Sequence, residues 1–474
     1  MDDAPYARPA AGTIWAPRAW LGGRWGEQVL LCAGADGTWT SVQEGVRTPA
    51  GAQVLEGAVL PGLVNAHSHA FQRAFAGMAE ERAHGQDDFW SWRDRMYQVA
   101  LRVTAEQQRA IAAQLFLELL RGGYTQVCEF HYLHNAPAGG NYPPSDVRMA
   151  RAIAAAAADT GIGLTLLPTV YERAGFAQPQ LRADQQRFGA DAQTVLAMRA
   201  RLRQEIATTA VGTPPVRVGL ALHSLRAATP AAIARLCAGA DDAPIHIHIA
   251  EQTGEVDDCL AQTGLRPIEW LLQNAPVDRR WHLVHATHAT AAEIQAVARS
   301  GAGVVLCPST EANLGDGIPD LPAWLHHDVP LSLGTDSHVC RSALEELRLL
   351  ETAQRLARRV RCVAAAPQQG HASTAARLLS RVTAGGAAAA GYPTWGLQVG
   401  ARADLLVVDS ATPALLGIPA SQLLDALVFS SPSRPFRDVL VAGRWVHRDH
   451  QSPQSAQVAQ RFTTAMEQLW AKSK

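Results

Sequence analysis

The stretch Asn65-Ala66-His67-Ser68-His69-Ala70-Phe71-Gln72-Arg73 follows a short apolar run and decides the predicted fold. Side chains two positions apart on a strand point to the same side, so His67 and His69 face one direction. Two imidazoles at the C-terminal end of a strand form half of a metal site, and catalytic groups of parallel barrels lie at that end. Taken alone, the motif also fits a polar turn after a strand.

Further apolar runs alternate with helical patterns from about residue 62 to residue 385, which is typical of βα units around a parallel sheet. Thr104 and Gln107 form a capping box ahead of one helix, and Gly122-Gly123 marks its end. With residues 63–66, the runs supply the eight strands that a (β/α)8 TIM barrel needs. The other predicted strands span residues 124–130, 163–168, 216–222, 244–250, 281–285, 303–307 and 331–335.

Short β-like runs also lie outside the barrel, between residues 13 and 60 and again after residue 397. We expect these two groups to pair, because a barrel inserted between the halves of one sandwich brings both termini together. The predicted fold is therefore α/β, a TIM barrel with a small β-sandwich domain built from both termini. The predicted domains are residues 1–60 as the first sandwich half, 61–390 as the metal-dependent barrel, and 391–474 as the second half with a terminal helix.

The composition narrows the class of protein. The chain has 474 residues, a formal net charge of -1 and no basic run, which argues against a nucleic-acid or membrane-surface binder. It contains no apolar run of about 18 residues, so we expect no membrane span. The acidic N-terminus does not resemble a secretory signal. Seven scattered cysteines without CxxC pairs indicate reduced thiols, and we expect a cytoplasmic protein.

Three more predicted strands end in residues that bind metals or transfer protons. His246 and His248 share one face of a strand, and His248, nearer its end, should reach the metal while His246 lies deeper in the core. Glu251 follows that strand and suits a proton shuttle, although alone it reads as a loop carboxylate. His285 and Asp336 end two later strands. We expect Glu251, His285 and Asp336 to be catalytic residues. The four expected metal ligands are His67, His69, His248 and Asp336.

The chain resembles the amidohydrolase superfamily, whose elements it contains in the same order. These elements are Leu60-Pro61-Gly62, His67-Ser68-His69, His248, His285, Asp336 and Ala403-Asp404-Leu405. The resemblance implies that a metal-bound hydroxide attacks a polarised carbon, with the ligands assigned above.

Within that superfamily, the chain is similar to the formimidoylglutamate deiminases, a family of histidine degradation. The matching stretches are residues 67–73, 89–93, 129–132, 223–226, 246–252 and 309–317. The resemblance implies hydrolytic deamination of N-formimino-L-glutamate to N-formyl-L-glutamate and ammonia. It also implies a set of substrate-binding residues, namely Gln72, Arg93, Tyr132, His223 and Arg226.

The chemistry of this substrate agrees with those residues. Formiminoglutamate has two carboxylates and a cationic amidine, so its binding site needs guanidinium or hydroxyl donors at one end. Arg93, Arg226 and Tyr132 can supply them. Each arginine could instead form an ordinary ion pair of the barrel surface.

The only lysines of the chain are Lys472 and Lys474. Binuclear members of the superfamily bridge their metals with a carboxylated lysine on a barrel strand, so the resemblance implies a single divalent ion here. Zinc suits mixed histidine and aspartate ligands, while iron and manganese stay open. The expected partner is a small dicarboxylate amidine, without nucleic acid or membrane; a homodimer is left open.

Two alternatives differ in class. A related deaminase of a nucleobase or another ring amidine would favour aromatic stacking surfaces over paired arginines. An inactive amidohydrolase scaffold could serve as a binding protein, but the intact ligand set argues against that interpretation. Ammonia-release assays distinguish the first alternative, and the metal content tests the second.

Overall fold

The structure is a computed structural model of the chain, and it describes residues 12–80, 89–137, 142–143, 145–207, 216–430 and 432–471. Both lysines lie outside the described residues, and so do residues 1–11 of the predicted sandwich and the side chains of residues 89–91 of the matching stretch. In the described ranges, no helix combines the length and the apolar character that a membrane crossing requires.

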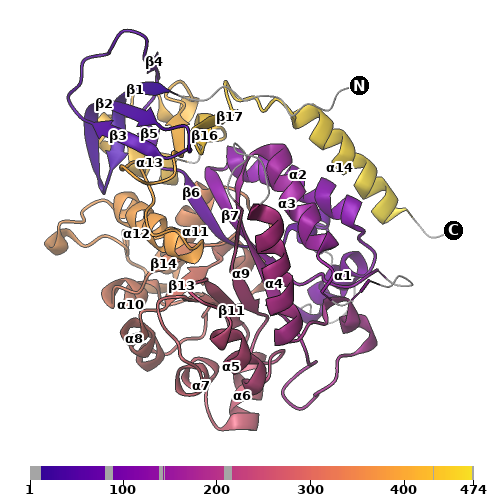
Figure 1. Cartoon of the computed structure of the whole chain (residues 1–474). Helices are drawn as coiled ribbons and strands as arrows, with labels where there is room; N and C mark the ends of the chain where they lie inside the picture. Colours follow the sequence, from indigo (N-terminus) through magenta and orange to yellow (C-terminus); the bar gives the residue numbers. More distant parts are fainter. Residues whose placement is uncertain are drawn as a thin grey trace, which may run out of the picture.

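A closed parallel barrel forms the centre of the molecule (Figure 1). Its strands pair in chain order, β14 pairs back with β6, and β10 pairs with both β8 and β11. Except in β9, every strand residue is buried, as expected when helices cover the sheet. The strands are β6 (Leu63–Ser68), β7 (Tyr124–His131), β8 (Gly163–Val170), β9 (Val216–Val218), β10 (Leu220–Leu222), β11 (Ile245–Ile249), β12 (Trp281–His285), β13 (Gly303–Leu306) and β14 (Leu331–Leu333).

One predicted strand differs from the structure. The run at residues 216–222 is divided into β9 and β10 at Gly219, so nine segments fill eight positions of the barrel. The chain just before β11 approaches closely at this point, as shown by the 2.9 Å that would separate a Cβ on Gly219 from the carbonyl oxygen of Pro244. The other predicted strands agree with the structure within two residues at each end.

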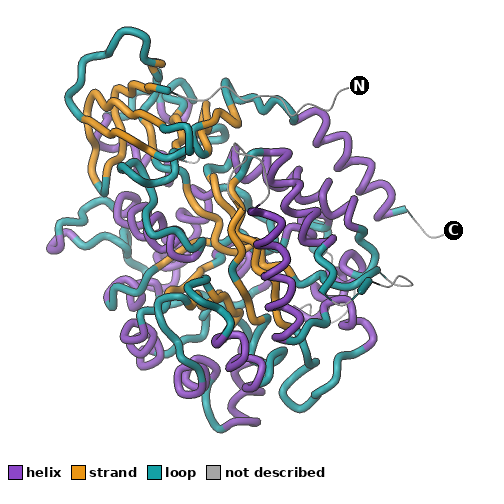
Figure 2. Tube along the Cα trace, viewed as in Figure 1, coloured by secondary structure: helices purple, strands orange, loops and turns teal. Residues whose placement is uncertain are grey.

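The helices of the chain surround this barrel (Figure 2). The predicted capping box is confirmed at the start of α2, where Thr104 and Gln107 bond reciprocally, and Gly122 is the C-cap. The helices are α1 (Phe89–Ala100), α2 (Ala105–Arg121), α3 (Arg148–Thr160), α4 (Ala192–Ala207), α5 (Pro230–Ala238), α6 (Thr253–Thr263), α7 (Pro267–Asn274), α8 (Ala291–Ser300), α9 (Pro308–Leu314), α10 (Leu321–His326), α11 (Ala343–Arg358), α12 (Thr374–Ala389), α13 (Leu423–Phe429) and α14 (Ser455–Trp470).

Both ends of the chain build the second sheet, which lies to one side of the barrel in Figure 1. β15 from the C-terminal part pairs antiparallel with β5 from the N-terminal part, which confirms the predicted pairing. The strands are β1 (Thr13–Leu21), β2 (Arg24–Ala33), β3 (Trp39–Gln43), β4 (Gln53–Val54), β5 (Val59–Leu60), β15 (Leu405–Val408), β16 (Phe436–Val441) and β17 (Arg444–His447). The domain limits near residues 60 and 390 stay a prediction.

A buried ion pair joins the small domain to the barrel. Arg402 donates to Asp404 and also to the side chain of Gln126 and the carbonyl oxygen of Thr125, both on β7. Arg402 and Asp404 are 6% and 2% exposed. The Ala403-Asp404-Leu405 element therefore fixes the small domain against the strand next to β6.

Candidate functional site

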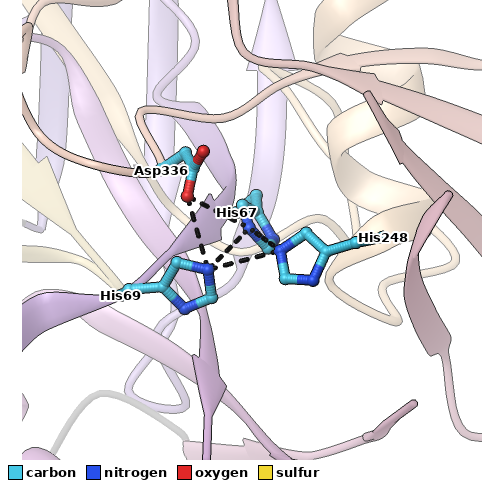
Figure 3. A group of neighbouring side chains, drawn as sticks. All are labelled: His67, His69, His248 and Asp336. Carbon is cyan, nitrogen blue, oxygen red and sulfur yellow. Dashed lines mark hydrogen bonds and ion pairs between the residues drawn. The ribbon is translucent and has the colours of Figure 1, made fainter. Parts of the chain in front are cut away.

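Four metal-type donors converge at the C-terminal ends of the barrel strands (Figure 3). The Nε2 atoms of His67, His69 and His248 lie 2.9–3.3 Å from one another. Oδ1 of Asp336 lies 3.4 Å from Nε2 of His67 and 3.3 Å from Nε2 of His69. The structure thus brings together all four predicted ligands, with all four side chains buried.

Hydrogen bonds on the far side of two rings orient their Nε2 atoms toward this centre. Nδ1 of His69 donates to the carbonyl oxygen of Phe130 at 3.0 Å, and Nδ1 of His248 donates to that of His223 at 2.8 Å. Each ring then carries its proton on Nδ1 and keeps an Nε2 lone pair for a metal, the usual arrangement of histidine ligands.

The spacing of the donors fits the ligands of a divalent metal ion. Ligands about 2.0–2.1 Å from a tetrahedral metal lie about 3.3–3.4 Å apart, close to the distances between these atoms. Burial lowers the pKa of His67, His69 and His248. Neighbouring imidazoles lower the pKa of His67 and His248 further, whereas Asp336 partly opposes the effect of burial on His69. The rings are therefore neutral, as metal binding requires.

The backbone turns sharply where the strands deliver these side chains. Ala250, His285 and Asp336 have φ values of +51°, +67° and +45°, a region that residues other than glycine seldom adopt. Such strain costs about 1–3 kcal/mol per residue and gathers at functional sites. It is retained here at three strand ends, next to or at the predicted catalytic residues.

Glu251 and His285 lie beside the donor cluster. Oε1 of Glu251 and Oδ2 of Asp336 are each 3.7 Å from Nε2 of His285, and Nδ1 of His285 faces Glu311 at 3.3 Å. Burial raises the pKa of Glu251 to about 7, while burial of His285 is outweighed by the carboxylates, which raise its pKa. A carboxyl group that titrates near neutral pH can both accept and release a proton.

A buried polar network supports the strand that carries the two ligands of the first motif. The Ser68 hydroxyl donates to Glu129, which also accepts the backbone N–H of Ala70, and Nε2 of His338 lies 3.3 Å from the same hydroxyl. On the other side, Asn65 and Thr335 bond to each other through side chain and backbone. These bonds tie β6 to β7 and to the segment that bears Asp336.

A cavity opens in front of the donor cluster. The five predicted substrate-binding residues all line it, together with His69, His248, Glu251, His285 and Asp336. Gln72 donates to the hydroxyl of Tyr132 at 3.4 Å, and the Arg93 guanidinium lies 5.7 Å from the ring centre of Tyr97. The structure therefore places every predicted site residue except His67 on the lining of one cavity, and His67 lies directly behind it, in contact with His69 and His248.

The sequence did not single out several residues of this site. Glu311 and Glu129 lie inside the quoted stretches, but only the fold shows that they contact His285 and Ser68. Tyr171 and Gln185 also line the cavity, although they follow no motif of the sequence. His246 lies deeper in the barrel, as expected, and donates to the carbonyl oxygen of Ala389.

Comparisons with known proteins place this site in context. Residues 58–446 match the model of the amidohydrolase family. The formimidoylglutamate deiminase of Pseudomonas aeruginosa is 46% identical over 458 residues, which are 96% of this chain and 99% of that protein. A 5-methylthioadenosine/S-adenosylhomocysteine deaminase of Natronomonas pharaonis is 29% identical over 83% of this chain and 82% of its own. A crystal structure of an amidohydrolase from Brucella melitensis is 38% identical, with a TM-score of 0.90, and covers 97% of this chain and 100% of its own.

Proposed function

This chain belongs to the amidohydrolase family, and on that basis we propose that it hydrolyses N-formimino-L-glutamate to N-formyl-L-glutamate and ammonia. It is then a hydrolase of the carbon–nitrogen bonds of linear amidines, in histidine degradation. The identity of 46% along nearly the whole chain to a formimidoylglutamate deiminase supports this substrate.

The observation that carries the proposal is the composition of the cavity. The lining includes three of the four metal-type donors, His69, His248 and Asp336, together with Glu251 and His285. It also includes two guanidiniums, those of Arg93 and Arg226. Guanidinium groups bind carboxylates in a paired, charge-assisted geometry. A substrate with two carboxylates and a reacting amidine matches both kinds of group at once.

We propose one zinc ion as the metal, held by His67, His69, His248 and Asp336. When bound, a divalent ion lowers the pKa of a water molecule and makes it a nucleophile near neutral pH. The absence of lysine from residues 1–471 supports a single ion, since no carboxylated lysine can bridge two.

Different residues of the site then carry out the successive proton transfers. Asp336 and His285 assist the removal of a proton from the attacking water, whose oxygen forms a bond to the formimino carbon. Glu251 delivers a proton to the terminal nitrogen, and the bond between that nitrogen and the carbon breaks. The hydroxyl group on the carbon then gives its remaining proton to Glu251, which has just released its own. The carbon keeps the oxygen as a formyl group, and the nitrogen leaves as ammonia.

Replacing Arg93 or Arg226 with methionine is expected to weaken substrate binding. Losing one partner of a buried charged pair costs about 2 kcal/mol or more, so KM should rise about 30-fold or more. Steady-state kinetics and elemental analysis test this prediction, with the metal content expected to stay unchanged. Arg201→Met on the exposed face of α4 is the matched control; unchanged KM in both Arg93 and Arg226 variants would refute the assignment.

Product analysis tests the proposed reaction itself. Breaking the terminal carbon–nitrogen bond gives N-formylglutamate and ammonia, whereas breaking the other bond of the same intermediate gives formamide and glutamate. We expect one ammonia for each N-formylglutamate. Formamide and glutamate as the products would overturn the proposed roles around the departing nitrogen.

We also propose a cytoplasmic location for this enzyme. All seven cysteines are free thiols in the structure, as expected of a protein in a reducing compartment. The homodimer stays a prediction.

A further inference from the structure

Two glutamine–tyrosine pairs line the cavity. In the first, the side-chain amide of Gln72 donates to the hydroxyl oxygen of Tyr132 at 3.4 Å. In the second, the side-chain amide of Gln185 donates to the hydroxyl oxygen of Tyr171 at 3.1 Å. The first pair belongs to the proposed substrate-binding set, whereas the second has no role assigned so far.

The orientation of Gln185 is fixed by its own neighbour in the chain. Its Oε1 accepts the backbone N–H of Arg182 at 3.1 Å, as the N3 residue of a short 3-10 helix at Ala183–Phe188. The amide nitrogen must then point the other way, to Tyr171. Because Gln185 is the donor in this bond, the phenol hydrogen of Tyr171 is left for a further acceptor.

The surroundings of Tyr171 favour an anionic acceptor. The side chain is 8% exposed, and the guanidiniums of Arg226, Arg182 and Arg93 are close enough to act on its charge. Burial raises the pKa of Tyr171 above its ordinary value, and the opposing effect of these arginines is smaller. The hydroxyl is therefore a neutral donor beside positive charge, which is the setting that a carboxylate needs.

The ring contacts place Tyr171 away from the reacting end of the cavity. The ring centre of His223 lies 5.1 Å from that of the ligand His248 and 4.6 Å from that of Tyr171. Tyr171 thus contacts the ligand ring of His248 through the ring of His223, and no ring contact is seen between Tyr171 and a ligand histidine among the described residues. A hydroxyl group in this position suits the carboxylate end of the substrate rather than its amidine.

We propose that Tyr171 is a further substrate-binding residue that donates a hydrogen bond to a substrate carboxylate, with Gln185 as the residue that positions it. This inference rests on the proposed function, because it takes the ligand to be a dicarboxylate. It adds a hydroxyl donor to the guanidinium donors of Arg93 and Arg226.

The first test is Tyr171→Phe, which removes one hydroxyl and keeps the ring. A hydrogen bond to a charged group is worth enough to raise KM for formiminoglutamate about tenfold or more, with kcat little changed. Glutarate has two carboxylates and no amidine, so its Kd, measured by calorimetry on the metal-loaded enzyme, should rise by the same factor. Tyr124→Phe is the control, because Tyr124 is a buried barrel tyrosine that does not line the cavity.

The second test concerns Gln185→Leu. If Gln185 acts through Tyr171, this variant should weaken glutarate binding in the wild-type background and have little further effect in the Tyr171→Phe background. Full additivity of the two substitutions would overturn the positioning role. A Kd within twofold of wild type in Tyr171→Phe, or no glutarate binding by the wild type, would overturn the inference as a whole.

These outcomes can be distinguished from a failure of the proposed function. The proposed function fails if the wild-type enzyme releases no ammonia from formiminoglutamate. The inference about Tyr171 fails if Tyr171→Phe binds glutarate as tightly as the wild type, and this binding measurement needs no turnover.

Discussion

Replacing His248 with alanine is expected to remove the metal and nearly all activity. Three donors would remain of four, and the carbonyl oxygen of His223 would lose the Nδ1 donor that orients this ring. We expect about one metal ion per wild-type chain and much less than that in the variant, because four protein ligands together hold one ion in sites of this kind. Elemental analysis after exhaustive dialysis measures this and also identifies the metal.

His246→Gln is the matched control for that experiment. His246 lies on the same strand and the same face, but its Nε2 donates to the carbonyl oxygen of Ala389, a bond that the glutamine amide can replace. This variant should keep its metal. Full retention of metal in His248→Ala, or two ions per wild-type chain, would contradict the single-metal site.

Replacing Glu251 with glutamine is expected to lower kcat by about a hundredfold to ten-thousandfold, the usual contribution of a general acid or base. The substitution keeps the size of the side chain and most of its hydrogen-bonding capacity, and it removes the exchangeable proton. Metal content and glutarate binding should change little, because Glu251 is not one of the four metal-type donors.

Glu255→Gln is the control for the Glu251 variant. Glu255 lies in the first turn of α6 and is also buried. It accepts the backbone N–H of Glu251 at 3.2 Å, which a glutamine oxygen can also do. Its loss of kcat should therefore be much smaller. Full activity in Glu251→Gln would show that another group, with His285 the first suspect, transfers the proton.

The barrel could be predicted because its signals are local. Most strands lie in short apolar runs, several of which contain, end at or are followed directly by a histidine or aspartate, and the parallel arrangement places their C-terminal ends at one edge. His67, His69, His248 and Asp336 could thus be expected to meet without knowledge of any contact. The split at Gly219 could not be predicted, because it lies where Pro244, far away in sequence, comes close to the strand.

The rest of the site depends on backbone geometry and on loops. The positive φ values of His285 and Asp336 turn these side chains into the cavity, and no propensity of histidine or aspartate predicts them. Tyr171 and Gln185 meet through a loop whose path is set by tertiary contacts. The resemblance to a known family supplied Gln72 and Tyr132, whose bond to each other appears only in the fold.

The most direct test of the account is ammonia release by the metal-loaded enzyme from three substrates at equal concentration: formiminoglutamate, its aspartate analogue and 5-methylthioadenosine. Because Arg93 and Arg226 can bind carboxylates, we predict that kcat/KM for formiminoglutamate exceeds that for the nucleoside by about a hundredfold or more, since the nucleoside has no carboxylate to offer them. The aspartate analogue should fall between them. Faster release from the nucleoside, or none from formiminoglutamate, would contradict the proposed function.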